Sequence, residues 1–565
     1  MKQFMKYTVL VMMIGMAALA GHARTININV AKVRGDLPME LRQLCENATF
    51  SDTVVLNFGK GTYKIDATVI CKCHVIMKGM GTKKSKIVFA HGHSRNGKRA
   101  YTSDAFFKFQ GTPAQPITVS ISDIAFGIEE HDGILWEGAE RHAVKILHAN
   151  RVDIHDVDSY LENAYITNFD LRVCSNVTIV NNTFTNYNNC ETGGCLWLRG
   201  ETHNVLVKGN RFNKYGKDET LAIFDNVIDA STGNVNGVCS RTNIVIEDND
   251  IYFGGYKGRD KDPAAVPGMV FSLFTAEQDD RDQCTTTDFH LRNNRFYLDD
   301  ATMRTIYIGF SPNDRHRDIY VENNQIYNNN IRRDWKYYHD DITVHDKSAD
   351  TDTIQVKGNS IVNRAMVTQS DGSNGYMFVR LYGGNVALTG NRLVDEVTVN
   401  PQTGKPAGVQ LIYCTASTGS VTMRDNVFKG VGRLAFLSSS KRVNNFTLNA
   451  ENNYFSGDPH IYCYKIDQAH VNFTRNTLVS NNTGFFLRNF PDNGTLTFIN
   501  NDVTVSPGNG TLLIQWGNGS DNRMRFDQLE ISNNVFHGVK SEQEMLKNMK
   551  NVGKRKVKAN TYYAK

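Results

Sequence analysis

Residues 176–184, Asn-Val-Thr-Ile-Val-Asn-Asn-Thr-Phe, carry the pattern that decides the fold. Polar and apolar residues alternate, two linking residues follow, and the segment ends with Asn, any residue and an apolar residue. A period of two predicts a β-strand with one buried face. The pattern returns at 204–212, 243–251, 288–296, 318–326, 353–361, 385–393, 420–428, 447–455, 470–478, 495–503 and 528–536.

The seventh position of every copy is an asparagine. Repetition at intervals of 23 to 45 residues predicts a solenoid, in which each coil buries its apolar side only by stacking on its neighbours. We expect each Asn to end its strand, because Asn tolerates a left-handed backbone, and to join an amide ladder inside the array. An antiparallel sandwich would show hairpin turns and no fixed Asn register. The repeated residues are Asn182, Asn210, Asn249, Asn294, Asn324, Asn359, Asn391, Asn426, Asn453, Asn476, Asn501 and Asn534.

A second short alternating strand lies between successive copies, so each coil contains at least two strands, and a third could lie in the variable stretch. The clearest examples are Leu196–Arg199, Ile306–Ile308, Ile342–His345, Met377–Tyr382, Val409–Leu411, Ile461–Tyr464 and Phe485–Arg488. Upstream, Leu37–Ala48 has the spacing of a helix that would cover the open core of the first coil.

The segment 54–81, with a strand, a G-x-G-x-Tyr turn at 59–63 and a G-x-G turn at 79–81, resembles the opening of the pectate-lyase-like right-handed parallel β-helix superfamily. The resemblance covers most of the chain as architecture. It implies an all-β right-handed parallel β-helix with an N-terminal helical cap. It also implies an exported, carbohydrate-active protein of bacterial type, and it makes calcium a candidate cofactor, because many β-helix lyases need calcium held by clustered acids.

The first 23 residues have the features of a secretory signal peptide. Lysines precede an apolar run at 9–20, and Gly21-His22-Ala23 forms a small-x-small cleavage site, so cleavage is expected near Ala23. We therefore expect a location in the periplasm, outside the cell or at its surface, with no integral membrane segment. The expected division is 1–23 signal peptide, 24–115 cap and first coils, 116–536 β-helix coils and 537–565 C-terminal cap or tail.

Composition adds weaker expectations. The formal charge of +5 is mild and spread along the chain, which is ordinary for solubility and compatible with an acidic polysaccharide partner. We expect no nucleic-acid partner and a monomer. Ten cysteines in an exported chain could form disulfides. Cys190 and Cys195 are close enough to pair across a loop, whereas Cys71 and Cys73 suit separate packing.

On the second strands, small and branched apolar residues occupy every other position and should face the interior. The residues at the alternate positions should therefore face outward. Aromatic rings there would stack on sugars, and arginines would hold carboxylates or sulfates. In the alternative, long loops fold over this sheet and bury the aromatics as a second core. The expected substrate-binding residues are Trp197, Arg199, Tyr307, Phe378, Tyr462, Tyr464 and Arg488.

Two constellations suggest catalysis. Asp340 and Asp341, in the titratable cluster 339–345, could act as an acid/base pair, or could satisfy backbone groups in a turn. Alternatively, Arg380 could neutralise a uronate carboxylate, while His345 takes the adjacent proton and Tyr382 protonates the leaving oxygen.

The leading hypothesis is therefore a polysaccharide lyase that acts on an acidic glycan by β-elimination. A glycoside hydrolase that uses the paired carboxylates, and a non-catalytic glycan-binding solenoid, are the alternatives.

Overall fold

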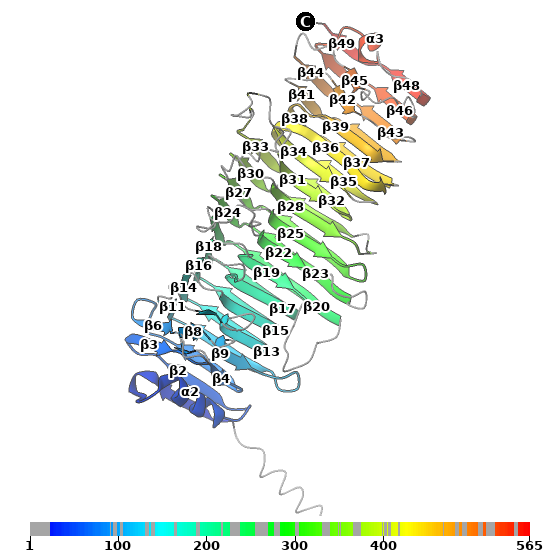
Figure 1. Ribbon diagram of the computed structural model, residues 1–565. Coiled ribbons are helices and arrows are strands. Elements are labelled where there is room, and N and C mark those ends of the chain that lie inside the picture. The colour runs from blue at the N-terminus through cyan, green and yellow to red at the C-terminus, as the bar shows by residue number, and fades with distance from the viewer. Residues whose placement is uncertain are drawn as a thin grey trace, which may run out of the picture.

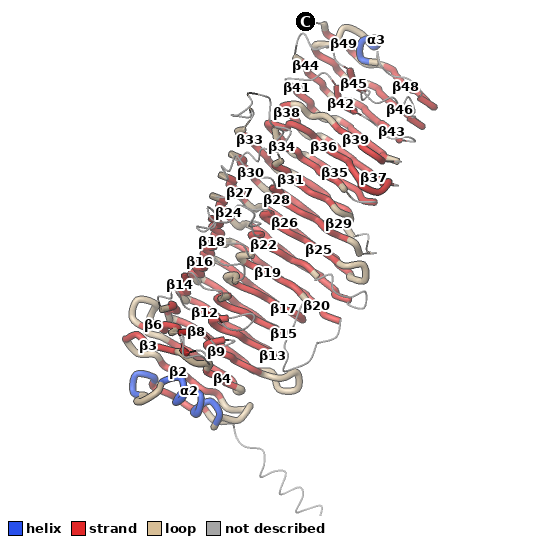
Figure 2. The backbone as a smooth tube through the Cα atoms, in the orientation of Figure 1, coloured by secondary structure: helices blue, strands red, loops and turns tan. Residues whose placement is uncertain are grey.

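The computed structural model shows an elongated stack of strands with the helix Leu37–Glu46 (α2) at its N-terminal end (Figure 1). Helix is confined to α2, the short 3-10 turn Val30–Lys32 (η1) and Glu542–Met545 (α3) among the described residues (Figure 2). The structure describes residues 23–564 apart from 91, 94–98, 102–104, 130–134, 137–141, 163–165, 188–192, 216–218, 226–237, 255–268, 276–282, 300–303, 330–338, 349, 351, 365–374, 398, 400–403, 405–407, 416–417, 444, 467, 481–484, 489–493, 507–511, 516–525 and 547–551.

Strand pairings run in three parallel series along the stack, which we call the site sheet, the second sheet and the third sheet. The site sheet contains β4 (Val69–Cys71), β9 (Ala105–Gln110), β13 (His142–His155), β15 (Thr167–Val180), β17 (Leu196–Lys208), β19 (Leu221–Phe224), β22 (Met269–Phe274), β25 (Arg304–Phe310), β28 (His339–Asp346), β31 (Tyr376–Leu381), β34 (Val409–Cys414), β36 (Val427–Val443), β39 (Ile461–Ile466), β42 (Phe485–Arg488) and β45 (Leu512–Gln515).

The second sheet contains β1 (Thr25–Asn29), β2 (Thr53–Asn57), β5 (His74–Lys78), β10 (Ile117–Ser122), the second halves of β13, β15 and β17, β20 (Val238–Glu247), β23 (Gln283–Arg292), β26 (Arg315–Glu322), β29 (Thr353–Lys357), β32 (Asn385–Thr389), β35 (Thr418–Arg424), β37 (Asn445–Glu451), β40 (Ala469–Thr474), β43 (Gly494–Ile499), β46 (Phe526–Ser532) and β48 (Val552–Lys558).

The third sheet contains β3 (Gly61–Ile65), β6 (Ser85–Phe89), β11 (Ala125–Ile128), β14 (Asp158–Glu162), β16 (Thr183–Tyr187), β18 (Arg211–Tyr215), β21 (Asp250–Gly254), β24 (Arg295–Leu298), β27 (Gln325–Asn328), β30 (Ser360–Asn363), β33 (Arg392–Asp395), the first part of β36, β38 (Tyr454–Gly457), β41 (Thr477–Ser480), β44 (Asp502–Val505), β47 (Val535–His537) and β49 (Thr561–Tyr563). A separate small sheet contains β7 (Gly92–His93), β8 (Arg99–Tyr101) and β12 (Leu135–Trp136).

Equivalent residues of successive coils stack in register, so each interior position forms a column of apolar side chains. In the site sheet, Ile306, Ile342, Val379 and Ile412 follow one another and none is exposed to solvent. Burial alternates along most strands with the period of two that the repeat predicts. The predicted architecture, an all-β right-handed parallel β-helix with an N-terminal helical cap, is confirmed.

The predicted amide ladder is also confirmed. Each repeated Asn is buried, and its Nδ2 donates to Oδ1 of the Asn one coil later, at 2.9 Å from Asn182 to Asn210 and 3.1 Å from Asn501 to Asn534. The ladder continues to Asn560, which the repeat pattern does not include. One detail of the prediction is wrong: the left-handed residue is the one before each ladder Asn, for example Asn323 with φ 54°.

Helix α2 covers the N-terminal end of the stack, as the sequence suggests, and the C-terminal end carries a further coil. Helix α2 is capped by Asp36, whose side chain accepts a hydrogen bond from the backbone N–H of Met39, and it buries Leu41 and Cys45 on the first coils. At the other end, β48 and β49 form a further coil, so the solenoid continues past the expected boundary at residue 536. No described helix is long and apolar enough to cross a membrane. The expected signal peptide lies outside the described residues, apart from Ala23.

A disulfide joins Cys239 and Cys284, which are paired positions of β20 and β23 on neighbouring coils. The expected pair of Cys190 and Cys195 is wrong, because Cys195 is a buried free thiol, packed against the carbonyl of Phe184. Residue 190 itself lies outside the described residues. Cys71 and Cys73 are separate buried thiols, as expected.

Candidate functional site

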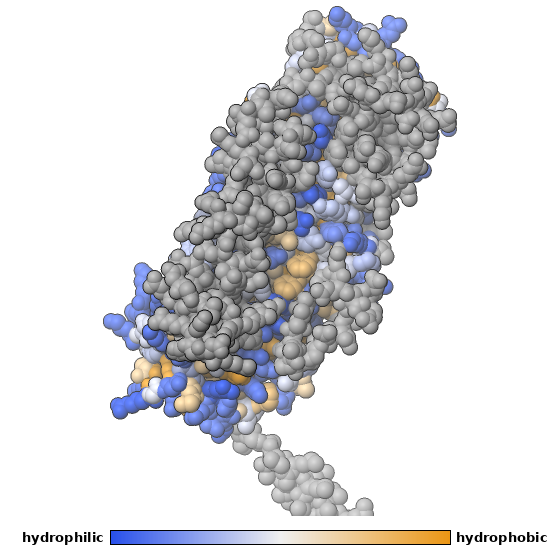
Figure 3. Space-filling model, viewed as in Figure 1, coloured by the Kyte–Doolittle hydropathy of each residue, from blue (hydrophilic) through white to orange (hydrophobic). Residues whose placement is uncertain are grey.

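The outer face of the site sheet carries the charged clusters of the candidate site. In Figure 3, the visible described surface here has an apolar patch over β19 and β22, with hydrophilic surface on either side of it along the stack. The central outward column consists of Asp170, Trp197, Ala222, Ser272, Tyr307, Thr343, Arg380 and Tyr413.

The first group, the Asp340 cluster (Arg304, Tyr307, Asp340, Thr343, His345, Arg380 and Tyr382), comes from β25, β28 and β31 and the residue after β31. Arg380 lies at its centre. Its Nε is 3.1 Å from Asp340 Oδ2, and its Nη1 donates to the Tyr382 hydroxyl at 2.9 Å. The rings of His345 and Tyr382 are 5.1 Å apart, and the Tyr307 hydroxyl is 3.2 Å from His345 Nδ1. The structure therefore brings together four of the five predicted catalytic residues.

The backbone allows this contact because of a glycine. A Cβ at Gly309 would lie 2.9 Å from the Tyr307 hydroxyl and 3.0 Å from a ring carbon, so only glycine lets the Tyr307 ring lie across this position. Gly309 pairs with His345 on the next strand. The ring of Tyr307 is thus directed along the stack toward the imidazole.

The electrostatics of the Asp340 cluster favour a persistent cation. Burial lowers the pKa of Arg380, but the Asp340 carboxylate together with Tyr382 and Tyr413 outweighs burial, so the pKa of Arg380 is raised. Burial raises the pKa of Asp340, and Arg380 opposes that rise. Asp340 is 1% exposed, and its Oδ1 accepts no hydrogen bond from any described residue.

Two predicted site residues, Asp341 and Phe378, lie in the interior. At the start of β28 and β31, Asp340 pairs with Met377, and Ile342 pairs with Val379. The residues between these two pairs are Asp341 and Phe378. Both turn inward at the corner of the coil. Phe378 packs on Phe428 in the core with no exposed surface. The prediction of Phe378 as an outward substrate-binding residue is therefore wrong.

Asp341 is fully buried among interior polar groups. It accepts a hydrogen bond from the Tyr376 hydroxyl, and its Oδ1 is 3.5 Å from His339 Nε2 and from Thr305 Oγ1. Asp340 instead contacts Thr343 and Arg380 on the outer face. The two neighbouring carboxylates point to opposite sides of β28, so Asp340 and Asp341 cannot act together as the acid/base pair that the sequence suggested.

A second group, the Asp170 cluster (His142, Lys145, Asp170, Arg172 and Arg199), lies five coil steps toward the N-terminus, ~24 Å from the Asp340 cluster. The Asp170 carboxylate is 2.7 Å from Arg172 Nε, 3.1 Å from Arg199 Nε and 3.2 Å from His142 Nε2. All five residues are buried. Sequence reasoning found only Arg199, although the alternation Phe169-Asp170-Leu171-Arg172 carries the same parity signal as the predicted second strands.

Burial and the neighbouring charges act in opposite directions on the pKa values of the Asp170 cluster. Burial lowers the pKa of His142 to about 4, so the imidazole is neutral at pH 7. Burial would raise the pKa of Asp170, but the cationic groups around it outweigh burial and hold that pKa below its usual range. A permanent carboxylate thus lies between two guanidinium groups. Removing one member of such a buried group would leave an uncompensated buried charge, which is strongly destabilising.

The remaining predicted binding residues differ in how far they are exposed to solvent. Trp197 and Arg199 are 9% and 2% exposed, and the Arg199 guanidinium lies 4.4 Å from the Trp197 ring centre. They therefore pack on each other, as the alternative of a second core suggested. Tyr307 is half-buried in the Asp340 cluster. The side chains of Tyr462, Tyr464 and Arg488 lie outside the described part of the structure.

Rows of aromatic side chains do occur on the outer faces, but their ring faces are not presented to solvent as stacking on a sugar would require. Phe224 and Phe274 are stacked at 5.4 Å with 9° between the ring planes, and Tyr252 and Tyr297 at 4.5 Å with 10°. Rings one coil apart cover each other's faces and show solvent mainly their edges. Within the described residues, no group of three or more His, Cys, Asp or Glu is arranged to hold a metal ion, so no calcium site can be assigned from them.

Comparison with known proteins gives likeness of architecture only. No protein-family model and no curated protein matches the chain. Among solved structures, the Agl-KA catalytic domain aligns at TM-score 0.42 and 13% identity over 76% of this chain and 68% of that one. A mannuronic acid specific polysaccharide family 6 lyase from human gut microbiota aligns at TM-score 0.30 and 11% identity, over 80% and 87%. The Azotobacter vinelandii mannuronan C-5 epimerase AlgE4 A-module aligns at TM-score 0.31 and 10% identity, over 76% and 94%.

Proposed function

We propose that this protein is an exported polysaccharide lyase that cleaves an acidic, uronate-containing glycan by β-elimination at the Asp340 cluster. The observation that carries the proposal is the convergence of a guanidinium, an imidazole and a phenol on one outer face. Arg380 contacts Tyr382 at 2.9 Å, and the ring of Tyr382 lies 5.1 Å from that of His345. All three side chains are partly exposed, so a polymer can reach them.

Elimination makes three demands that these groups can meet. The uronate carboxylate must be neutralised, a base must remove the proton on the adjacent carbon, and the departing oxygen must gain a proton as its bond to carbon breaks. Arg380, with its raised pKa, is the cation for the carboxylate. His345 is the base and Tyr382 the acid.

The hydrolase alternative has less support. It requires two carboxylates that face each other across the bound sugar. Asp341 lies in the interior with Tyr376, so it cannot serve as the partner of Asp340. A solenoid that only binds glycan remains as an outcome of the test. We propose a monomer as the acting form, and calcium enters the assay as a variable.

The test is the ultraviolet absorbance of the unsaturated uronate product, with pectate, alginate and chondroitin sulfate as substrates, with and without calcium. We expect a rise for the wild type and a loss of about a hundredfold or more in kcat/KM for Arg380→Ala and His345→Ala. Tyr382→Phe should behave likewise. The matched control Tyr327→Phe changes a half-buried tyrosine on the third sheet and should keep wild-type activity.

Other results would redirect the proposal. New reducing ends without unsaturated product would indicate hydrolysis. Equal activity of Arg380→Ala and Tyr327→Phe would refute the assignment of the Asp340 cluster. No product from any substrate, together with binding of one of them, would leave a glycan-binding solenoid.

A further inference from the structure

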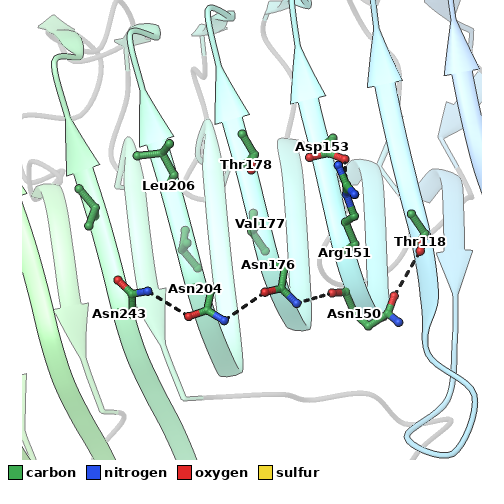
Figure 4. A pocket seen from close by; sticks show the side chains of 12 residues that line it. Thr118, Asn150, Arg151, Asp153, Asn176, Val177, Thr178, Asn204, Leu206 and Asn243 are labelled. Atoms are coloured by element: carbon green, nitrogen blue, oxygen red, sulfur yellow. Dashed lines mark hydrogen bonds and ion pairs between the residues drawn. The ribbon is translucent and has the colours of Figure 1, made fainter.

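A shallow groove of about 730 Å³ lies on the outer face of the second sheet, away from the site sheet (Figure 4). It crosses β10, β13, β15, β17 and β20, four coil steps, and so is ~19 Å long. Its volume falls in the range of sites that hold small ligands or short polymer segments. The groove is separate from both charged clusters.

One edge of the groove is a row of exposed asparagine amides. Asn243 Nδ2 donates to Asn204 Oδ1 at 3.0 Å, Asn204 Nδ2 to Asn176 Oδ1 at 3.0 Å, and Asn176 Nδ2 to the carbonyl of Asn150 at 2.8 Å. An amide has two N–H donors and an oxygen that accepts two hydrogen bonds. The row uses only one N–H of each of these donors and one lone pair of each acceptor. Asn176 and Asn204 therefore each offer a further donor and a further acceptor, repeated at the pitch of the coils.

The backbone does not by itself demand these amides. Asn176, Asn204 and Asn243 have φ of 51° to 53°, a left-handed conformation that Asn, Asp and Gly adopt most easily. The same position on the next two coils is occupied by Asp288 and Asp318, with φ of 56° and 57°. The change from amide to carboxylate comes where the groove ends. The left-handed corner can thus be formed without an amide, and the three amides stand on successive coils along the groove.

The floor beside the amides is apolar and carries no net charge. Leu206 and Val245 occupy outward, half-exposed positions next to Thr178, where the neighbouring coils carry Asp153 and His290. In Figure 4, Thr178 and Leu206 lie on the strands beside the amide row.

The charged groups at the N-terminal end of the groove neutralise each other, since Arg151 Nε is 2.8 Å from Asp153 Oδ2. This surface is unlike the Asp340 cluster, which is centred on an arginine. An acidic polymer therefore gains no net charge attraction here.

We propose that this groove binds a segment of uncharged polysaccharide, independently of the proposed lyase site. A pyranose ring has one apolar face and hydroxyls around its rim. Its apolar face would rest on Leu206 and Val245, while the hydroxyls of successive sugars exchange hydrogen bonds with successive amides. The groove would hold the protein on a neutral glycan while the Asp340 cluster meets an acidic one.

The test is native electrophoresis in gels that contain soluble galactomannan, mixed-linkage β-glucan or xylan. The variant Asn204→Asp keeps a residue that tolerates the left-handed backbone, removes the amide donor and adds a charge, and Leu206→Glu changes the floor. The control Asn293→Asp makes the same chemical change at another exposed left-handed position, with φ 56°, outside the groove.

We expect at least one of the three polysaccharides to retard the wild type and Asn293→Asp equally. Asn204→Asp and Leu206→Glu should each raise the apparent dissociation constant by about tenfold or more. Arg380→Ala should be retarded like the wild type, because the groove is independent of the Asp340 cluster. The proposal is overturned if none of the three polysaccharides retards the wild type, if Asn204→Asp binds as well as Asn293→Asp, or if Arg380→Ala abolishes the retardation.

Discussion

Removing one rung of the interior amide ladder should destabilise the protein far more than removing an amide from its surface. Asn324 is fully buried near the middle of the stack. Its Nδ2 donates to the Leu291 carbonyl at 2.8 Å and to Asn359 Oδ1 at 3.0 Å. Its Oδ1 accepts from the backbone N–H and the Nδ2 of Asn294 at 3.0 and 3.1 Å.

The expected loss of unfolding free energy for Asn324→Ala depends on which of its hydrogen-bond partners keep another partner. The side chain of Asn294 keeps its bond to the Ile246 carbonyl, and Asn359 Oδ1 keeps the bond from the backbone N–H of residue 324. The backbone N–H of Asn294 and the carbonyl of Leu291 lose this partner inside the protein. At about 2 kcal/mol for each, the unfolding free energy should fall by about 4 kcal/mol.

Urea unfolding followed by circular dichroism measures this loss. The control Asn472→Ala removes an outward, half-buried amide that donates one bond of 2.8 Å to Asn449, and it should cost about 0.5 kcal/mol or less, because water replaces the bond. The transition of Asn324→Ala should also broaden, because the coils on either side of the weakened rung are coupled less strongly. If the two variants unfold at the same urea concentration, the ladder is not what holds the coils together.

Three further predictions concern buried charge and cross-linking. Asp170→Asn should lower the unfolding free energy by about 3 kcal/mol or more in thermal melts, whereas the surface control Asp153→Asn should change little; equal melting temperatures would contradict this. Because the pKa of Asp170 is held below its unfolded value, its contribution is complete at neutral pH and is lost only in strong acid. Burial raises the pKa of Asp395 to about 7, so the folded state holds this proton more tightly than the unfolded chain does. Stability should therefore fall as the pH rises from about 4 to about 7, and Asp395→Asn should flatten that slope in urea titrations; an unchanged slope would assign it elsewhere. Reducing the Cys239–Cys284 bond, which closes a loop with a sequence separation of 45, should cost about 4 kcal/mol in denaturant titrations with and without reductant, and no shift would mean that the thiols do not pair in solution.

The fold was predictable because every coil repeats the same physical constraint. Val177 and Ile179 must face the interior, and Asn182 must satisfy backbone groups at a corner, so alternation and Asn recur together. The strands of the third sheet could not be recognised in the sequence, because they are short and begin inside the repeat. Strand β16, for example, starts at Thr183, directly after the ladder Asn.

The candidate site was predictable only where strands are regular. The alternation of inward and outward residues correctly predicts that Arg380, His345 and Tyr382 face outward. All three lie after the point where β28 and β31 begin to alternate regularly. The alternation fails for Asp341 and Phe378, because the corner turns two successive residues inward, and no local pattern marks that corner. Asp170 was missed because β15 passes through two sheets without interruption, and the repeat marks only its second half.

The register of the site sheet has a consequence for how such a protein can evolve. The Asp170 and Asp340 clusters are separated by whole coils, and each coil contacts mainly the coils before and after it. Duplication or deletion of one intervening repeat would change the spacing of the two clusters by one coil pitch, ~4.8 Å, and leave the composition of each intact. A gene segment that encodes one coil can thus be gained or lost as a unit. Such a change alters the distance between the two clusters and leaves the residues of each cluster unchanged.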